Sequence, residues 1–150
     1  MNITVVMGTS ARGCTFAMKE QFLSSLGSGN SVTEFTLPEA CPVFCTGCKA
    51  CFFKDISACP HAEYVMPIWE SFLAADLIVF CTPTYVFHAP AQMKALLDHL
   101  GKSGWRTRPT KRCSASRRLL LPTLSDREWA RRLKTSKTVL IFGVLPGHIR

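Results

Sequence analysis

A short apolar strand, a loop of small residues and an amphipathic helix open the chain, and this unit restricts the fold more than any other feature. Residues 3–7 are apolar and β-branched and stop at Gly8, which predicts a buried strand. A small-residue loop follows over 8–13, and residues 14–26 place apolar side chains at helical spacing. Such a loop brings unpaired N–H groups to a helix N-terminus, so the unit predicts an anion-binding site.

The same order of strand, loop and helix returns later in the chain. Residues 76–81 are the most strand-like run, and they lead through the loop 82–85 into a predicted helix over 89–100. Between the two units the pattern predicts a strand over 32–37 and a helix over 62–74. Two such units predict parallel pairing in a doubly wound α/β sheet, with the ligand site beyond the carboxyl ends of its strands.

The charge of the chain changes abruptly after Gly101. The whole chain of 150 residues, the size of one domain, has a net charge of +8. Residues 1–101 carry five basic and eight acidic side chains, a net charge of −3, whereas residues 102–150 carry thirteen and two, a net charge of +11. Nucleic acid is therefore not expected as a partner of the main body, and the basic segment has few aromatic side chains that could stack on bases.

Neither a signal peptide nor a membrane span is visible in the sequence. The first residues lack a charged n-region followed by an apolar h-region, and no apolar stretch reaches the roughly 18–20 residues of a transmembrane helix. We expect a cytoplasmic protein with no membrane partner. Its eight cysteines would then stay reduced, and clustered cysteines in that compartment more often bind metal or do redox chemistry.

Five of the eight cysteines lie between Cys41 and Cys59. Cys45, Cys48 and Cys51 are spaced three residues apart and Cys59 follows, which is similar to the run that holds ferredoxin-type clusters. Zinc sites more often use two cysteine pairs separated by a longer interval. The spacing favours an iron–sulfur cluster, and a zinc site, a redox thiol site and unliganded thiols remain as alternatives.

The remaining cysteines and two histidines receive structural interpretations. We interpret Cys14, Cys81 and Cys113 as small buried hydrophobic residues. His88 and His99 belong to no acid–base grouping in the sequence and are interpreted as surface or helix-cap residues.

The two loops at the strand ends carry the candidate ligand-binding residues. The first lacks the Lys-Ser/Thr ending of a Walker loop and the dinucleotide fingerprint, which disfavours ATP hydrolysis. Its Ser10, Arg12 and Thr15 suit the phosphate of a mononucleotide such as FMN, and a tight turn with incidental hydroxyls is the alternative. In the second loop, Tyr85 and Phe87 suit a flat heteroaromatic ring, and an aromatic cap over the sheet end is the alternative.

Together these motifs resemble the flavodoxin-like NAD(P)H-dependent FMN reductase family and, within it, the iron–sulfur flavoprotein branch. Residues 8–15 (GTSARGCT) are similar to the family's GSPRxxxNT phosphate loop, with Cys14 in place of the usual Asn. Residues 45–61 are similar to the branch's cluster motif, and residues 75–98 to the flavin-ring loop and the helix after it. The resemblance runs from Asn2 to about Gly101.

The resemblance implies a three-layer α/β/α fold and an FMN-dependent oxidoreductase with NAD(P)H or another electron donor. It also implies a homodimer or higher homo-oligomer, and a 4Fe-4S cluster on Cys45, Cys48, Cys51 and Cys59. The cofactor would carry the chemistry, so no catalytic side chain is expected. The residues expected around FMN are Ser10, Arg12, Cys14, Thr15, Pro83, Thr84, Tyr85, Val86 and Phe87. A zinc- or RNA-binding module that uses the cysteines and the basic segment is the alternative function.

Residues 102–150 do not continue this pattern. We expect residues 1–101 to form the FMN-binding domain, with a cysteine-rich insert at 41–60, and residues 102–150 to complete it poorly. Taken literally, the segment predicts a short basic helix that begins near Ser125 and a strand over 138–144.

The alternative is that residues from about Lys102 onward are translated out of frame. With codons chosen within the degeneracy of the code, reading the back-translated segment two bases later can turn residues 102–107 into Lys-Trp-Met-Ala-His and residues 138–145 into Ser-Leu-Asp-Phe-Trp-Gly-Val-Ala, strings that resemble the family at these places. In that case the product would be a defective remnant whose sheet lacks its proper last two strands, and the strand over 76–81 would have an exposed edge.

Overall fold

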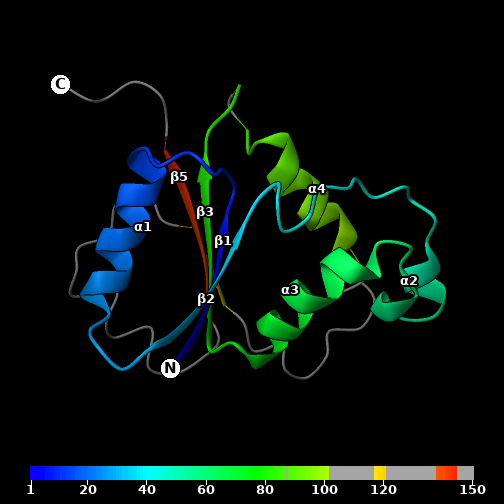
Figure 1. The fold of residues 1–150 in the computed structure, drawn as a ribbon, viewed down its shortest axis with the longest axis horizontal. Coiled ribbons are helices and arrows are strands. Elements are labelled where there is room, and N and C mark those ends of the chain that lie inside the picture. The colour runs from blue at the N-terminus through cyan, green and yellow to red at the C-terminus, as the bar shows by residue number, and fades with distance from the viewer. Residues whose placement is uncertain (87, 102–116, 121–137, 145–150) are drawn as a thin grey trace.

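In the computed structural model of this protein, a parallel sheet lies between helices on both of its faces (Figure 1). The structure describes residues 1–86, 88–101, 117–120 and 138–144. The elements, in chain order, are β1 (Asn2–Met7), α1 (Cys14–Ser25), β2 (Ser31–Thr36), α2 (Ala50–Phe53), the 3-10 helix η1 (Ile56–Ala58), α3 (Ala62–Ala74), β3 (Leu77–Pro83), α4 (Ala91–His99), β4 (Arg117–Leu120) and β5 (Thr138–Val144). The elements predicted over residues 1–101 are confirmed, with ends that shift by one or two residues.

The strands within the described residues form one sheet of order β2-β1-β3-β5-β4, and every pair is parallel. β1 pairs with β2 from Asn2↔Ser31 onward and with β3 from Ile3↔Leu77 onward. The loops after β1 and β3 therefore leave the same edge of the sheet side by side. This arrangement confirms the predicted doubly wound α/β fold, since the chain runs outward from β1 in both directions.

Alternating side chains of the central strands fill two separate cores. On one face, Ile3, Val5 and Met7 of β1 pack with Phe22 of α1. On the other face, Val6 packs with the buried side of α3 and α4. Figure 1 shows α1 on one side of the sheet and α3 and α4 on the other. Because successive side chains of a strand point to opposite faces, a central strand buried on both sides is apolar over most of its length, and the buried Thr4 of β1 hydrogen-bonds to Ser71.

A buried lysine joins α1 to the edge strand β2. The Lys19 side chain is only 4% exposed, and its Nζ donates a hydrogen bond of 2.8 Å to Glu34 Oε2 and lies 2.6 Å from Glu20 Oε1. Burial lowers the pKa of Lys19, but the hydrogen bonds to Glu20 and Glu34 outweigh it, so the pKa lies above its usual 10.5. The charge is retained at neutral pH because both carboxylates compensate it.

The C-terminal strands correct one expectation. β5 pairs with β3 over seven positions, from Leu77↔Thr138 to Pro83↔Val144. The expectation that an off-frame tail would leave one edge of β3 exposed is therefore wrong. The strand predicted over 138–144 is confirmed as β5, whereas the helix predicted near Ser125 lies outside the described residues. In the flavodoxin-like order the fourth strand lies beside the third. Here β5 takes that position, and β4 lies outside it.

The cysteine-rich segment between β2 and α3 folds into short pieces rather than a strand or a long helix. It contains α2 and η1, and Figure 1 shows it beyond α3 and α4, away from the sheet. Cys41 and Ile56 are buried and anchor its ends in the core on the α3 side. None of the helices in the described part of the chain has the length and apolar character needed to span a membrane.

Candidate functional site

A cleft of about 270 Å³ opens at the sheet edge where the loops after β1 and β3 meet. That volume is close to the lower end of the range, about 300–1,000 Å³, of cofactor and small-molecule sites. The residues that line it come from the two loops and the first turn of α1: Thr9, Ala11, Gly13, Cys14, Thr15, Pro83, Thr84 and Tyr85. The cleft thus lies where the sequence predicted a ligand site.

The start of the first loop is held tightly against β3 and α4. Gly8 N donates a 2.7 Å hydrogen bond to Cys81 O, and Gln92 Nε2 donates one of 2.8 Å to Gly8 O. A Cβ at Gly8 would lie 2.7 Å from Thr82 Oγ1, so a larger residue cannot take this place without a shift. The close approach sets the direction in which the loop leaves the sheet.

The N-terminus of α1 faces the cleft without a side-chain cap. Gly13 is the N-cap residue, no side chain caps the helix, and the first turn carries no acidic residue. Thr9 Oγ1 accepts a hydrogen bond from Ala11 N within the loop, and Thr15 is buried beside the cleft. Uncapped N–H groups with a nearby hydroxyl form a suitable environment for a phosphate.

Two of the predicted phosphate ligands are placed differently. Ser10 and Arg12 are exposed on the same loop, but they are not among the residues that line the cleft. The Arg12 guanidinium lies 5.4 Å from the centre of the Phe16 ring. Cys14 and Thr15 do line the cleft.

The second loop turns back on itself just beyond the cleft. Tyr85 N donates to His88 O at 2.8 Å, and His88 N donates to Tyr85 O at 2.9 Å, so the turn between them projects from the sheet edge. Val86 at its tip is 93% exposed and has a φ of 49°, a strained conformation for a β-branched residue. Pro83, Thr84 and Tyr85 line the cleft, whereas Phe87 lies outside the described residues.

A second, smaller cavity of about 50 Å³ lies in the cysteine-rich segment. Its wall is formed by Cys45, Thr46, Gly47, Cys48, Lys49, Cys51, Phe52, Cys59, Pro60, His61, Asp98 and His99. All four predicted metal ligands, Cys45, Cys48, Cys51 and Cys59, therefore share one cavity. Burial, followed by the charges of Cys59, Cys45 and Cys48, raises the pKa of Cys51, so this thiol stays protonated until a cation binds.

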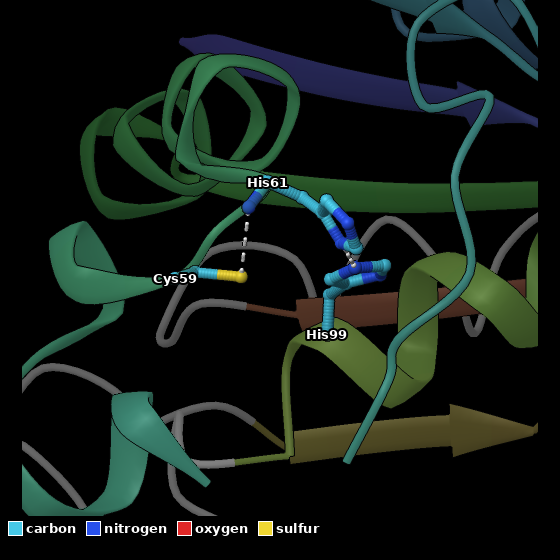
Figure 2. A group of neighbouring side chains, drawn as sticks. All are labelled: Cys59, His61 and His99. Carbon is cyan, nitrogen blue, oxygen red and sulfur yellow. Dashed lines mark hydrogen bonds between the residues drawn. The ribbon is translucent and has the colours of Figure 1, made fainter. Parts of the chain in front are cut away.

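Two histidines join the cysteines in this cavity, which sequence reasoning missed. His61 Nδ1 lies 3.0 Å from His99 Nε2, and the donor atoms of Cys59, His61 and His99 all lie within 4.8 Å of one another (Figure 2). His99 is only 3% exposed, so its interpretation as a surface residue is wrong, although it does end α4. The pairing of Cys59 with His61 two residues later was a signal for a metal site; His99 gave none.

The other cysteines follow the interpretation in part. Cys81 is buried, as predicted, and burial raises its pKa to about 12. Cys14 is exposed as the first residue of α1, so its interpretation as a buried hydrophobic residue is wrong, because the first turn projects past the sheet edge. Cys113 lies outside the described residues.

Comparison with known proteins gives a family and a fold. Residues 1–119 match the NADPH-dependent FMN reductase family. The structure is similar to an NAD(P)H:quinone oxidoreductase from Methanothermobacter marburgensis, with a TM-score of 0.62 and 18% identity, covering 99% of this chain and 87% of that chain. It is also similar to an azoreductase from Bacillus anthracis str. Sterne, with a TM-score of 0.61 and 15% identity, covering 95% of this chain and 86% of that one. A search of curated proteins finds no sequence that matches this chain.

Proposed function

The chain belongs to the NADPH-dependent FMN reductase family of NAD(P)H-dependent flavin oxidoreductases, and we propose that the cleft at the ends of β1 and β3 is its FMN site. The observation that supports this most is the meeting of an uncapped helix N-terminus and a proline–tyrosine loop in one cleft. One end suits a phosphate and the other a flat ring. Bound FMN would accept hydride from NAD(P)H and pass the electrons to an acceptor.

In this proposal each loop has a separate role. The N–H groups at the start of α1 and the Thr15 hydroxyl hold the phosphate. Arg12 and Ser10 move toward it from the exposed loop and donate further hydrogen bonds. Pro83, Thr84 and Tyr85 support one side of the ring, with Val86 beyond them, and the family resemblance adds Phe87 to this set. Cys14 takes the place of an amide side chain and can donate only a weak S–H hydrogen bond to the phosphate.

Binding of FMN to the full chain tests the site. We expect flavin absorbance in the purified protein and quenching of FMN fluorescence on titration. Thr15→Val removes one hydrogen bond to a charged group, worth about 1.5–3 kcal/mol, and should weaken FMN binding about 10- to 100-fold. Thr15→Ser should restore most of the affinity because it keeps the hydroxyl.

Lys54→Ala is the matched control. It removes one positive charge, as Arg12→Ala does, but at a position outside both the cleft lining and the first loop. Arg12→Ala should weaken FMN binding, and Lys54→Ala should leave it unchanged. Equal FMN affinity in the wild type, Thr15→Val and Arg12→Ala would exclude this cleft as the phosphate site.

We further propose that the electron acceptor is a small planar molecule of the quinone or azo class, the classes named for the two similar structures. The support is the open cleft, whose tyrosine and projecting turn leave one side of a bound ring accessible. Oxidation of NADPH should accelerate when a soluble quinone or an azo dye is added under anaerobic conditions. Flavin-loaded protein whose flavin is reduced by NADPH but is reoxidised by neither acceptor would contradict this proposal.

A 4Fe-4S cluster on Cys45, Cys48, Cys51 and Cys59 and a homo-oligomeric assembly remain predictions of the family resemblance. All four thiols line one cavity, as a cluster would need, but the same cavity also contains His61 and His99, which a four-cysteine cluster does not use. Iron and acid-labile sulfide in anaerobically prepared protein would test the cluster, and sedimentation of the full chain would test the assembly.

A further inference from the structure

The cavity of the cysteine-rich segment offers a donor set that the four-cysteine prediction does not contain. Cys59 follows η1, His61 is the N-cap residue of α3, and His99 is the last residue of α4. Figure 2 shows the two imidazole rings turned toward each other, with the Cys59 sulfur beside them. Two segments that are distant along the chain, residues 59–61 and the end of α4, thus place one sulfur and two nitrogens around a common point.

The hydrogen bonds of His99 fix which of its nitrogens faces that point. His99 Nδ1 lies 2.9 Å from Ala95 O. A carbonyl oxygen only accepts, so Nδ1 carries the proton and Nε2 presents its lone pair to His61 Nδ1. A carbonyl that orients the far nitrogen of a histidine is the usual second partner of a metal-bound imidazole.

Cys59 is prepared in a similar way. The backbone N–H of His61 donates to Cys59 Sγ at 3.5 Å, which holds the sulfur at the start of α3. Asp98, which also lines the cavity, is engaged by Lys94 on the same helix. A cation bound here would therefore be neutralised mainly by sulfur.

The spacing of the donor atoms suits one ion. Zn–N bonds of about 2.0–2.1 Å and Zn–S bonds of about 2.3 Å at tetrahedral angles place the two nitrogens about 3.3 Å apart and sulfur about 3.6 Å from each. The observed nitrogens are 3.0 Å apart, and all three donors lie within 4.8 Å. Movements of a few tenths of an ångström to about one ångström would reach this geometry.

The size of the cavity also favours a single ion. Its volume of about 50 Å³ exceeds the roughly 10–15 Å³ that one water-sized probe needs. A four-cysteine cluster needs four sulfurs spread around it, one for each iron, whereas the donors that converge here are one sulfur and two nitrogens. The cavity as it stands holds an ion without any opening of the loop.

We propose that this protein binds one structural zinc ion through Cys59 Sγ, His61 Nδ1 and His99 Nε2, and that Cys51, which lines the same cavity but lies outside this group of converging donors, moves in as the fourth ligand. The proposal is independent of the FMN site. It excludes a cluster on the same chain because both would need Cys59. On binding, the two thiols release their protons to solvent, and His61 exchanges the Nδ1 proton that it donates to His99 for one on Nε2, so that its Nδ1 lone pair is free for zinc.

The ion would clamp the cysteine-rich segment to the end of α4. Zinc has no redox chemistry of its own. The cavity shares no lining residue with the cleft at the other end of α4, a helix of nine residues and about 13 Å in length. The expected role is therefore structural: the ion joins the start of α3 to the end of α4.

Metal titration of the full chain tests the proposal. Protein stripped with a chelator under reducing conditions should take up one Zn²⁺ per chain, and Co²⁺ should give the visible spectrum of a tetrahedral site with sulfur-to-cobalt charge transfer. His61→Ala and Cys59→Ser should each weaken zinc binding by at least about 100-fold. His61→Cys should restore it, since a thiolate replaces the imidazole.

His88→Ala is the matched control, because His88 is exposed and lies outside the cavity; its zinc affinity should equal that of the wild type. If His61→Ala fails to fold, X-ray absorption of the zinc-loaded wild type still tests the ligand set. The spectrum must show scattering from imidazole rings bound to zinc. A wild-type chain that binds no zinc, a site without imidazole, or iron and sulfide retained in His61→Ala would each overturn the proposal. Flavin absorbance is measured on the same samples, so that a failure of zinc binding is distinguished from a failure of FMN binding.

Discussion

At the scale of single residues, the contact between Gly8 and Thr82 controls how the first loop leaves the sheet. The loop can start there only because Gly8 has no side chain: its backbone lies directly against Thr82 and Met93. The sequence correctly predicts that the strand ends at Gly8. The side chains that exclude a larger residue there, Thr82 and Met93, lie 74 or more positions further along the chain. Close packing of this kind cannot be read from a local pattern.

Gly8→Ala is expected to destabilise the protein. The added Cβ would lie 2.7 Å from Thr82 Oγ1 and 3.1 Å from Thr82 Cβ, so the loop or β3 must shift. Overpacking of this kind costs about 1–3 kcal/mol, and FMN affinity should fall with it. Gly13→Ala, where a Cβ meets no atom within 4 Å, should lose less unfolding free energy in urea titrations, because only the preference of an N-cap for glycine over alanine acts against it. Equal stability of the two variants would contradict the expectation.

The cysteines should differ sharply in reactivity. Burial raises the pKa of Cys81 to about 12, so almost none of it is thiolate at neutral pH, and the side chain is only 1% exposed. Cys14 is exposed at the start of α1. Brief treatment with iodoacetamide should alkylate Cys14 and leave Cys81 unmodified, and both should react in denaturant, as peptide mass spectrometry would show. Equal labelling of both residues in the folded protein would refute this assignment.

At the scale of elements, the buried Lys19 links α1 to β2 and shows why amphipathic patterning is incomplete. The helical pattern placed Lys19 in an amphipathic helix, but only the pairing of α1 with β2 brings Glu34 within 2.8 Å. The same limit applies to the cavity at the ends of α3 and α4. Each histidine is ordinary within its own helix, and the pair exists only because the two helices pack together.

Lys19→Met is expected to cost about 1–3 kcal/mol at neutral pH, because Glu34 loses a charged hydrogen-bond partner. The pKa of Lys19 is raised in the folded state, so its stabilisation is complete below the usual pKa of 10.5 and is lost as the pH rises through the folded value. The difference in Tm between the wild type and Lys19→Met should therefore be constant from neutral pH to about pH 10 and shrink above it.

Lys94→Met serves as the comparison, because Lys94 and Asp98 form an exposed pair one helical turn apart on α4. Such pairs contribute about 0.5 kcal/mol or less, so this variant should differ little from the wild type. A Lys19→Met difference that persists unchanged above pH 11 would show that the ion pair is not its cause.

At the scale of the whole molecule, the junction after Gly101 separates an acidic body from a strongly basic segment. The family match extends to residue 119, past the point where the sequence motifs stop. β5 rather than β4 lies beside β3, which differs from the order of flavodoxin-like sheets. The extended match counts against the hypothesis that residues from about Lys102 are out of frame, whereas the altered strand order supports it.

We predict that sequencing the gene across codons 98–115 will reveal an inserted or deleted base relative to the frame that continues the family pattern. A chain with the restored frame should bind FMN more tightly and unfold at a higher temperature than the present one, because it would carry the family's own last strands and third flavin loop. An intact frame in independent reads, together with peptides of the basic tail found by mass spectrometry, would refute the hypothesis.

The sequence by itself determined the fold class, the elements over residues 1–101 and the sheet edge at which the cleft opens. These depend on local periodicity, on small residues at strand ends and on the rule that parallel strands end together. It also identified the cysteines that line one cavity. Each of these features is set by residues close together in the chain.

Only the tertiary structure decided which side chains meet. It placed Arg12 and Ser10 outside the cleft lining, showed that Cys14 is exposed and His99 buried, and joined His99 to His61 at the ends of two different helices. The physical reason is that burial and donor geometry depend on the packing of whole helices against the sheet. That packing is a sum over many distant contacts, and no single stretch of sequence contains it.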